Sequence, residues 1–397
     1  MSDLEAFRRE IVAFIEARCP ASMRTPLLAD DEEPWGGRRG VFKNPDTKVW
    51  LDAMAERGWT APTWPLEYGG GGLTDAEARV LEEELRRAGC RPALKSLGIW
   101  MLGPVLLQFG SEAQKRAHLP AIVRGQSRWC QGYSEPGAGS DLASLQTRAV
   151  LDGDHYVVEG SKVWTSHADK ADWMFCLVRT DPSAPKHEGI GFLLIDMSTP
   201  GISVRPIRLI SGASPFCETF FEGVRVPHEN LVGGAGRGWT IAKALLSHER
   251  ALISKMRDER SSDDEALDVL AKHYLGTDDH GRIADPVVRD RVAQVQLDTL
   301  CNKLTLRRSE ESARAGHGPG PETSMFKLYG TELSKRRLEL SIDIAGYAGV
   351  GWEGPGFEPE ELARTRTWLR SRASSIEGGS SEIQLNVIAK RVLGLPD

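Results

Sequence analysis

The apolar positions of residues 1–128 follow a helical pattern. Near the start they recur every three or four residues on one face, as in an amphipathic helix. Further on, Thr74-Asp75-Ala76-Glu77 has the form of a capping box, in which side chains pair with the first free amides of a helix. The apolar residues of the first predicted helix are Leu4, Phe7, Ile11 and Phe14 or Ile15, and those of the helix after the capping box are Val80, Leu81 and Leu85. We therefore expect an N-terminal helical domain over 1–128.

The pattern changes in residues 129–235 to short β-rich runs separated by turns. Asp152-Gly153 lies between two such runs, which is a strong hairpin signal. Runs of this length, broken by Pro and Gly, predict a compact β-barrel or sandwich rather than βαβ units. The runs are 148–151, 155–159, 173–178, 191–195, 202–207 and 219–226.

Helical spacing returns in residues 236–397. The apolar stripes contain few β-branched residues, which favours an antiparallel bundle of long helices. Residues 257–285 are rich in charge and Gly, so we expect a loop or a broken helix there. The stripes are Ile241, Leu245, Leu246, Leu252 and Ile253; Ala293, Leu297, Leu300 and Leu304; and Phe326, Tyr329, Leu333 and Leu340. The predicted fold class is mainly α with a central β domain: helical domain 1–128, β-barrel-like domain 129–235 and C-terminal four-helix bundle 236–397.

Composition narrows the classes of function. The chain has 397 residues with a formal net charge of -6, and its basic residues are dispersed, which disfavours nucleic-acid binding. Its six cysteines form no Cys-x-x-Cys pair, so we expect reduced thiols, no metal site and a cytoplasmic location. The N-terminal segment contains acidic residues, unlike a signal peptide, and no apolar run reaches the roughly 18–20 residues of a membrane span.

Two segments have the chemistry of a cofactor site. The loop 134–141 reads SEPGAGSD, where glycines let backbone amides approach a ligand and serines add hydroxyl donors. Lys162-Val163-Trp164-Thr165-Ser166 ends a strand-like run with a broad aromatic face beside two hydroxyls. A planar cofactor with a diphosphate tail needs such groups. In contrast, residues 349–354 have the spacing G-x-G-x-x-G, but Pro355 follows at once and prevents the helix start of a dinucleotide fingerprint.

These segments, with the order of helices, strands and helices, resemble the acyl-CoA dehydrogenase family. The resemblance spans nearly the whole chain. Further matching pieces are Glu67-Tyr68-Gly69-Gly70, Phe109-Gly110-Ser111-Glu112, Gly238-Trp239, the tail segment 378–384 (GGSSEIQ) and 391–396 (RVLGLP).

The resemblance implies an FAD enzyme that converts an acyl-CoA to the trans-2-enoyl-CoA and passes electrons to an electron-transfer flavoprotein. It places Ser134 at the pyrimidine edge of the flavin and Ser166 at the ring nitrogen that accepts hydride. The residues implied in cofactor binding are Gln131, Tyr133, Ser134, Gly139, Ser140, Trp164, Thr165, Ser166, Arg282, Ser380 and Glu382. Those implied in substrate binding are Ser140, Ser247, Arg250, Gly378 and Gly379.

Two carboxylates are candidates for the base that removes the α-proton. Many family members place a Glu in the tail motif, and here Glu377 stands one residue too early. Other members place it in a Glu-Arg pair on a helix of the C-terminal domain, which Glu249-Arg250 matches. Glu249 also shares a helical face with Ile241 and Leu245, and desolvation on such a face raises a carboxyl pKa toward that of a useful base.

Several alternatives stay open at this point. Residues 280–286 lack the Phe-Gly pair with which family members reach the flavin of a neighbouring subunit, although Arg282 could contact the diphosphate. The missing pair motivates one alternative, a non-catalytic subunit of a heteromeric dehydrogenase. A flavin monooxygenase and another elimination on a CoA thioester, on a related fold, are further alternatives. The acyl group could be linear, branched or ring-bearing. We expect a homodimer or homotetramer, with a heteromer possible.

Overall fold

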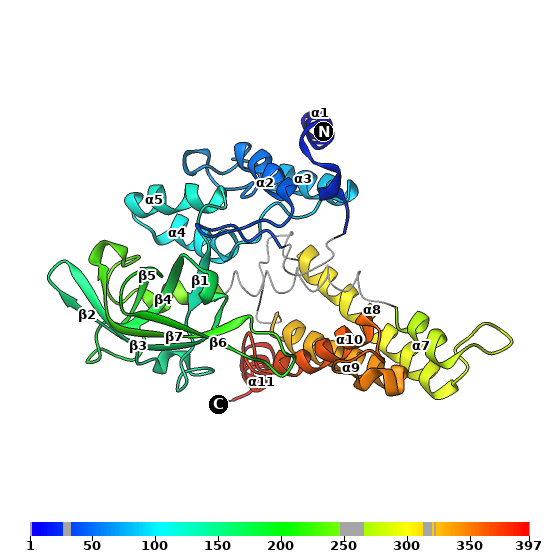
Figure 1. The fold of residues 1–397 in the computed structure, drawn as a ribbon. Coiled ribbons are helices and arrows are strands. Elements are labelled where there is room, and N and C mark those ends of the chain that lie inside the picture. Colours follow the sequence, from blue (N-terminus) through cyan, green and yellow to red (C-terminus); the bar gives the residue numbers. More distant parts are fainter. Residues whose placement is uncertain (1, 27–32, 247–265, 313–319, 321–322, 397) are drawn as a thin grey trace. The chain divides into compact units, whose positions relative to one another are not determined.

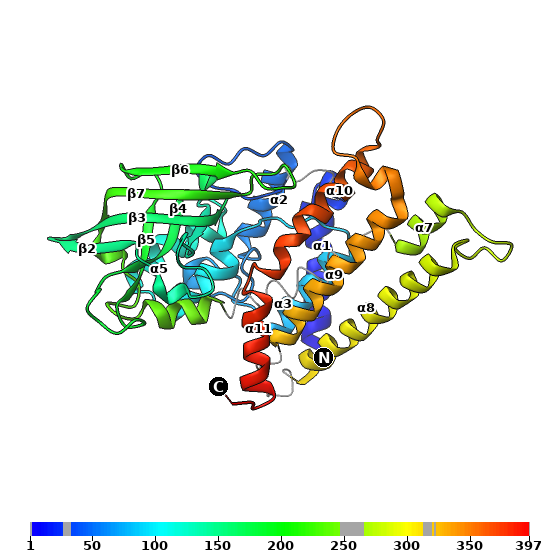
Figure 2. The same cartoon turned by 90° about the horizontal axis from the view of Figure 1, so that it is seen from below.

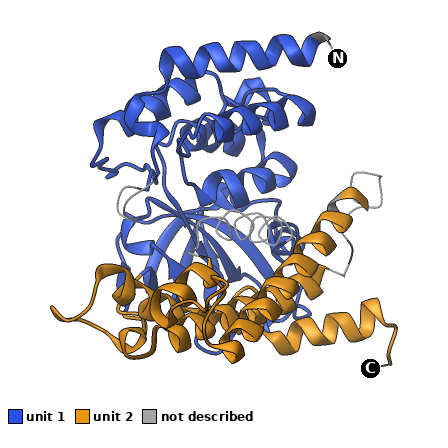
Figure 3. Ribbon diagram, turned by 90° about the vertical axis from the view of Figure 1, so that its right-hand side faces the viewer, with its two compact units in different colours: residues 1–207, 215–249 blue, residues 208–214, 250–397 orange. Residues whose placement is uncertain are grey.

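The structure is a computed structural model that describes residues 2–26, 33–246, 266–312, 320 and 323–396. It divides into two compact units, which Figure 3 colours separately. Unit 1 comprises Met1–Ile207 with Pro215–Glu249, and unit 2 comprises Arg208–Ser214 with Arg250–Asp397.

The first part of unit 1 is helical, as predicted (Figure 1). The predicted capping box begins the third helix, where the Thr74 side chain accepts from the Glu77 amide and the Glu77 side chain accepts from the Thr74 amide. Arg8 on the first helix forms an ion pair with Glu84, a nearly buried carboxylate on the third. The helices are α1 (Ser2–Arg18), α2 (Pro45–Glu56), α3 (Asp75–Arg87), α4 (Gly103–Phe109) and α5 (Glu112–Val123).

A curled seven-stranded sheet follows in the order β1-β4-β2-β3-β7-β6, with β5 paired to β4. β2 and β3 form the predicted hairpin, and β3, β7 and β6 run antiparallel side by side (Figure 2). The short β1, which the sequence did not reveal, pairs in parallel with β4. The strands are β1 (Trp129–Gly132), β2 (Arg148–Asp152), β3 (His155–Ser166), β4 (Trp173–Arg179), β5 (Ile190–Asp196), β6 (Ile202–Ile207) and β7 (Phe216–Pro227).

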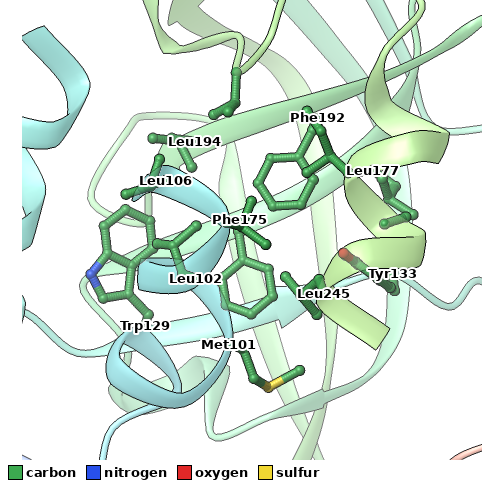
Figure 4. Packing of buried hydrophobic residues seen from close by; sticks show 14 of the residues in the cluster. Met101, Leu102, Leu106, Trp129, Tyr133, Phe175, Leu177, Phe192, Leu194 and Leu245 are labelled. Atoms are coloured by element: carbon green, nitrogen blue, oxygen red, sulfur yellow. The ribbon is translucent and has the colours of Figure 1, made fainter. Parts of the chain in front are cut away.

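The main core of unit 1 lies where helices pack on this sheet (Figure 4). Phe175 and Phe192 on adjacent strands stack with ring centroids 6.1 Å apart. Leu102 and Leu106, just before and within α4, approach the same cluster, as does Leu245 from the helical residues 238–246. Burial of such apolar surface is the main force that holds these helices on the sheet.

Unit 2 is helical, so the predicted order of helices, β sheet and helices is confirmed. Residues 267–275 of the segment expected to be a loop or broken helix form a helix, and 276–285 connect it to the next. The helices are α7 (Leu267–Leu275), α8 (Pro286–Ser312), α9 (Thr323–Ala345), α10 (Pro359–Ser371) and α11 (Ser381–Val387). In the described part of the chain, no helix has the length and apolar character to cross a membrane.

The apolar residues of α8 lie on more than one face of the helix. Val292 and Val295 enter the core, whereas Leu297, Leu300 and Leu304 are each more than half exposed. Both sets have helical spacing, and the contacts that α8 makes with α7 and α9 decide which set is buried.

Candidate functional site

The loop after β1 has free space beside its main chain at two glycines. Glu135 and Ala138 pair across a tight turn: the Glu135 amide donates to the Ala138 carbonyl with an N to O distance of 3.1 Å, and the Ala138 amide donates to the Glu135 carbonyl at 3.0 Å. At Gly137 and Gly139 an added Cβ would have no atom within 4 Å. The two glycines therefore leave room for a ligand directly against the main chain.

Ser134 is fixed to the end of β3. Its carbonyl oxygen accepts a hydrogen bond of 2.9 Å from the Val163 amide. This bond brings the loop beside Trp164 and Ser166, so the structure joins the two segments that the sequence singled out.

The backbone at the end of β3 is strained. Trp164 (φ 60°) and His167 (φ 53°) are the only non-glycine residues with left-handed backbone in the described part of the chain. The pairing of β3 with β7 also shifts register between Lys162 and Thr165. The bulge leaves the Trp164 side chain 54% exposed, with its edge against Phe216. Strained non-glycine residues cluster at ligand sites, where the surrounding structure holds them.

Three serine hydroxyls at this place are available to a ligand. Within the described residues, the hydroxyls of Ser134, Ser140 and Ser166 make no hydrogen bond. Ser134 and Ser166 are half-buried and Ser140 is exposed. Hydroxyls in half-buried and exposed positions can pair with water or with a bound molecule.

The other candidates of unit 1 lie differently. Gln131 is half-buried on β1. The Tyr133 ring packs in the core against Phe175 and Phe192 (Figure 4). The Thr165 side chain is fully buried, and its hydroxyl has no partner in the residues that the structure describes. Contacts of Tyr133 and Thr165 with a cofactor would therefore use backbone atoms.

Two charged residues of unit 2 that bear on the predicted site have local partners. Glu377 accepts a hydrogen bond of 2.7 Å from Arg370. Arg282 donates from Nε to Asp278 at 2.9 Å in the loop before α8. These ion pairs give both side chains a structural role as well as the predicted one.

The tail motif forms the start of α11. Gly378 (φ 66°) and Gly379 (φ 94°) have left-handed backbone, which favours glycine at both positions. Ser380 caps the helix by accepting from the Ile383 amide at 3.4 Å. Hydrogen bonds from its own amide and from Ser380 lower the pKa of Glu382.

Three predicted residues, Ser247, Glu249 and Arg250, lie outside the described residues. Among the described residues, no group of three or more His, Cys, Asp or Glu side chains could hold a metal ion.

Family models match the chain along almost its whole length. They describe the N-terminal, middle and C-terminal domains of acyl-CoA dehydrogenases and cover residues 2–126, 130–224 and 236–393. The acyl-CoA dehydrogenase IpdE1 of Mycobacterium tuberculosis is 37% identical, over 88% of this chain and 88% of its own length. The chain belongs to the acyl-CoA dehydrogenase family.

Two further comparisons refine this assignment. FadE34 of the same organism is 38% identical over 87% of this chain, but the match spans only 46% of FadE34. Among solved structures, the Tcur3481-Tcur3483 steroid ACAD has a TM-score of 0.72 at 29% identity and covers 100% of this chain and 98% of its own. The chain is thus an oxidoreductase acting on CH–CH groups, in a family of FAD-dependent enzymes of lipid metabolism.

The residues of unit 1 fit FAD. A flavin requires open backbone, hydroxyl groups and an aromatic surface, and unit 1 provides all three. They are the glycine backbone at Gly137 and Gly139, the hydroxyls of Ser134, Ser140 and Ser166, and the exposed ring of Trp164. When bound, FAD supplies the acceptor for the hydride, which no side chain can provide.

Two side chains behind this site, Glu135 and Lys162, lie in the two candidate segments but had no role assigned from the sequence. Lys162 is 0% exposed and forms an ion pair with the nearly buried Glu135. A signal for this pair existed, because Lys162 lies an even number of residues after the buried Tyr156 and Val158 of β3. A lysine at an inward position of an alternating strand needs a buried anion.

Proposed function

We propose that this chain dehydrogenates the Cα–Cβ bond of an acyl-CoA thioester and forms the trans-2-enoyl-CoA. The observation that carries the proposal is the convergence of Ser134, Trp164 and Ser166 at the strained end of β3. Ser134 and Ser166 hold the flavin ring through their hydroxyls, and Trp164 covers it. Gln131, Gly139, Ser140 and the backbone of Tyr133 and Thr165 complete the contacts from this unit, with Arg282, Ser380 and Glu382 as candidates from the C-terminal region.

Glu249 is the proposed base. It follows Ile241 and Leu245 at intervals of four residues in the sequence, and both of these are fully buried. The competing Glu377 is held in an ion pair with Arg370 and stands one residue before the position that the tail motif of the family requires. Glu249 takes the α-proton, while Ser140, Ser247, Arg250, Gly378 and Gly379 are the candidates for binding the acyl-CoA.

A ring-bearing acyl group is the substrate class that we favour. The support is the similarity to the Tcur3481-Tcur3483 steroid ACAD, with both chains covered almost completely. Linear and branched acyl-CoA thioesters are the competing classes.

An electron-transfer flavoprotein is the proposed electron acceptor, and the proposed location is the cytoplasm. All six cysteines are free thiols, as expected in a reducing compartment. We also retain the domain boundaries 1–128, 129–235 and 236–397 as part of the proposal.

We further propose that the chain is an oligomer. Leu297, Leu300 and Leu304 form an exposed apolar stripe on α8, and such stripes mark protein interfaces. Homodimer and homotetramer are the simplest forms. The similar Tcur3481-Tcur3483 steroid ACAD carries the names of two components, which supports a heteromer as the alternative.

The test is anaerobic titration of the FAD-loaded protein with a panel of linear, branched and ring-bearing acyl-CoA thioesters. Bleaching of the flavin absorbance, fastest with ring-bearing thioesters, is the expected result. A flavin that no thioester reduces, or a protein that binds no FAD, would contradict the proposal. A monooxygenase would leave the flavin oxidised in this experiment, and a non-catalytic subunit would bind FAD only when its partner is present.

A further inference from the structure

We propose that Lys162 and Glu135 are a positioning pair for the flavin: their buried ion pair sets the Ser134 hydroxyl and the Trp164 ring in the geometry that binds FAD. The inference rests on the flavin site proposed above. It assigns a role to two side chains that lie behind the loop and do not face the cofactor.

Hydrogen bonds fix the main chain on both sides of Ser134. Lys162 Nζ donates to the carbonyl oxygen of Tyr133 at 3.1 Å and to Oε1 of Glu135 at 2.8 Å. The carbonyl of Ser134 itself accepts from Val163 at 2.9 Å. Three successive residues of the loop are therefore tied to two successive residues of β3, which leaves the Ser134 side chain as the free group.

Glu135 extends the same network to the start of β2. Its carboxylate accepts from the backbone amides of Gln146 at 2.6 Å and Thr147 at 2.9 Å. Although burial raises the pKa of Glu135, the charge of Lys162 and the hydrogen bonds from Lys162, Thr147 and Gln146 hold it below its ordinary value. The carboxylate thus remains charged at neutral pH and binds both ends of the loop.

Lys162 also fixes the position of Trp164. The register shift between β3 and β7 begins directly after Lys162, which pairs with Thr219. The strained left-handed backbone of Trp164 follows two residues later. A strained residue keeps its conformation only where its neighbours are held, and Lys162, at 0% exposure, is the anchored neighbour.

The attraction between Lys162 and Glu135 does not by itself explain why an ion pair is buried here. A buried ion pair can often be replaced by apolar residues of similar size without loss of stability, because desolvation offsets much of the attraction. The directional bonds to Tyr133 and Glu135, in contrast, cannot be replaced by apolar side chains. A positioning role therefore predicts that the folded double variant binds FAD more weakly and with altered flavin dichroism, whereas a purely structural role predicts only a lower unfolding temperature.

The experiment compares the wild type with Lys162→Met, with the double variant Lys162→Met/Glu135→Leu, and with Lys186→Met as the matched control. Lys186 forms an ion pair with Asp141 in the same loop, but this pair is about half exposed. The measurements are thermal unfolding of the apoprotein, the Kd for FAD, and the visible circular dichroism of the bound flavin.

We expect the double variant to unfold at a lower temperature than the wild type, because the Gln146 and Thr147 amides and the Tyr133 carbonyl lose their partners. Well below that temperature, the folded double variant should bind FAD about ten- to a hundredfold more weakly than the wild type. Its flavin dichroism should change, whereas Lys186→Met should match the wild type in all three measurements. A double variant with wild-type FAD affinity and dichroism would overturn the inference. If the double variant does not fold, the same criteria apply to Glu135→Gln, which preserves size but weakens the bond to Lys162. A wild type that binds no FAD would instead refute the proposed function.

Discussion

Replacing His118 should remove a loss of stability that the protein undergoes in mild acid. The His118 ring on α5 lies edge-on to Trp129 on β1 and Trp173 on β4, with centroids 5.3 and 4.9 Å away. The two indoles stack on each other at 5.4 Å. Burial in this contact lowers the pKa of His118 from its ordinary 6.5 to about 4.

The sign and size of the effect follow from this shift. Between pH 6.5 and pH 4 the unfolded chain binds a proton at His118 and the native protein does not, so acid favours unfolding in this window. The full shift is equivalent to about 3 kcal/mol, of which about 2 kcal/mol is lost between pH 7 and pH 5. Above pH 7 the native and unfolded forms are both neutral there, and the effect is absent.

The assay is urea unfolding of the wild type and His118→Phe at pH 7 and pH 5. Phe keeps a flat ring between the helix and the sheet but cannot bind a proton. Because other groups titrate equally in both proteins, the stability difference between them isolates His118, and it should shift by about 2 kcal/mol in favour of the variant at pH 5. His228→Gln, at a histidine that is 60% exposed, serves as the control for removing a histidine elsewhere in the protein. The same pH dependence in His118→Phe and the wild type would refute the reasoning.

Three further predictions concern single side chains. Trp164→Ala should weaken FAD binding about tenfold, the value of one aromatic contact, while apoprotein stability changes little because the ring is 54% exposed; equal FAD affinity by fluorescence titration would contradict this. Asp172→Ala should lower the free energy of unfolding by about 2–4 kcal/mol, since the buried carboxylate accepts from the Arg38 and Arg128 amides at 2.8 Å each; an unchanged unfolding midpoint would count against it. Thr74→Ala should cost about 1 kcal/mol by removing the cap of α3, and Thr74→Ser should restore it.

The sequence predicted the elements with strong local signals. The capping box at Thr74 and the turn at Asp152-Gly153 were recognised because the residues that form them are neighbours in the chain. β1 was missed because four residues are too few to show a period. The sequence does not show which apolar residues of α8 are buried, because its valines and leucines have equivalent spacing and only packing against other helices distinguishes them.

The site was predictable to a similar extent. The residues that face the proposed cofactor, such as Ser134 and Trp164, lie in short sequence motifs that resemble those of the family, so the sequence identified them. Their support was not found, because Glu135 and Lys162 are 27 residues apart. The contact of His118 with Trp129 and Trp173 likewise joins distant segments. Such pairs depend on strand register and helix docking, which the local pattern does not contain.

The central claim is that Glu249 removes the α-proton of an acyl-CoA, and anaerobic stopped-flow reduction of the flavin tests it most directly. With a thioester that bleaches the wild type, Glu249→Gln should retain FAD and substrate binding but reduce the flavin on the order of a thousandfold more slowly, because the amide cannot accept a proton. Glu377→Gln should cost only about tenfold. The opposite ranking would transfer the role to Glu377, and wild-type rates in both variants would contradict the dehydrogenase mechanism.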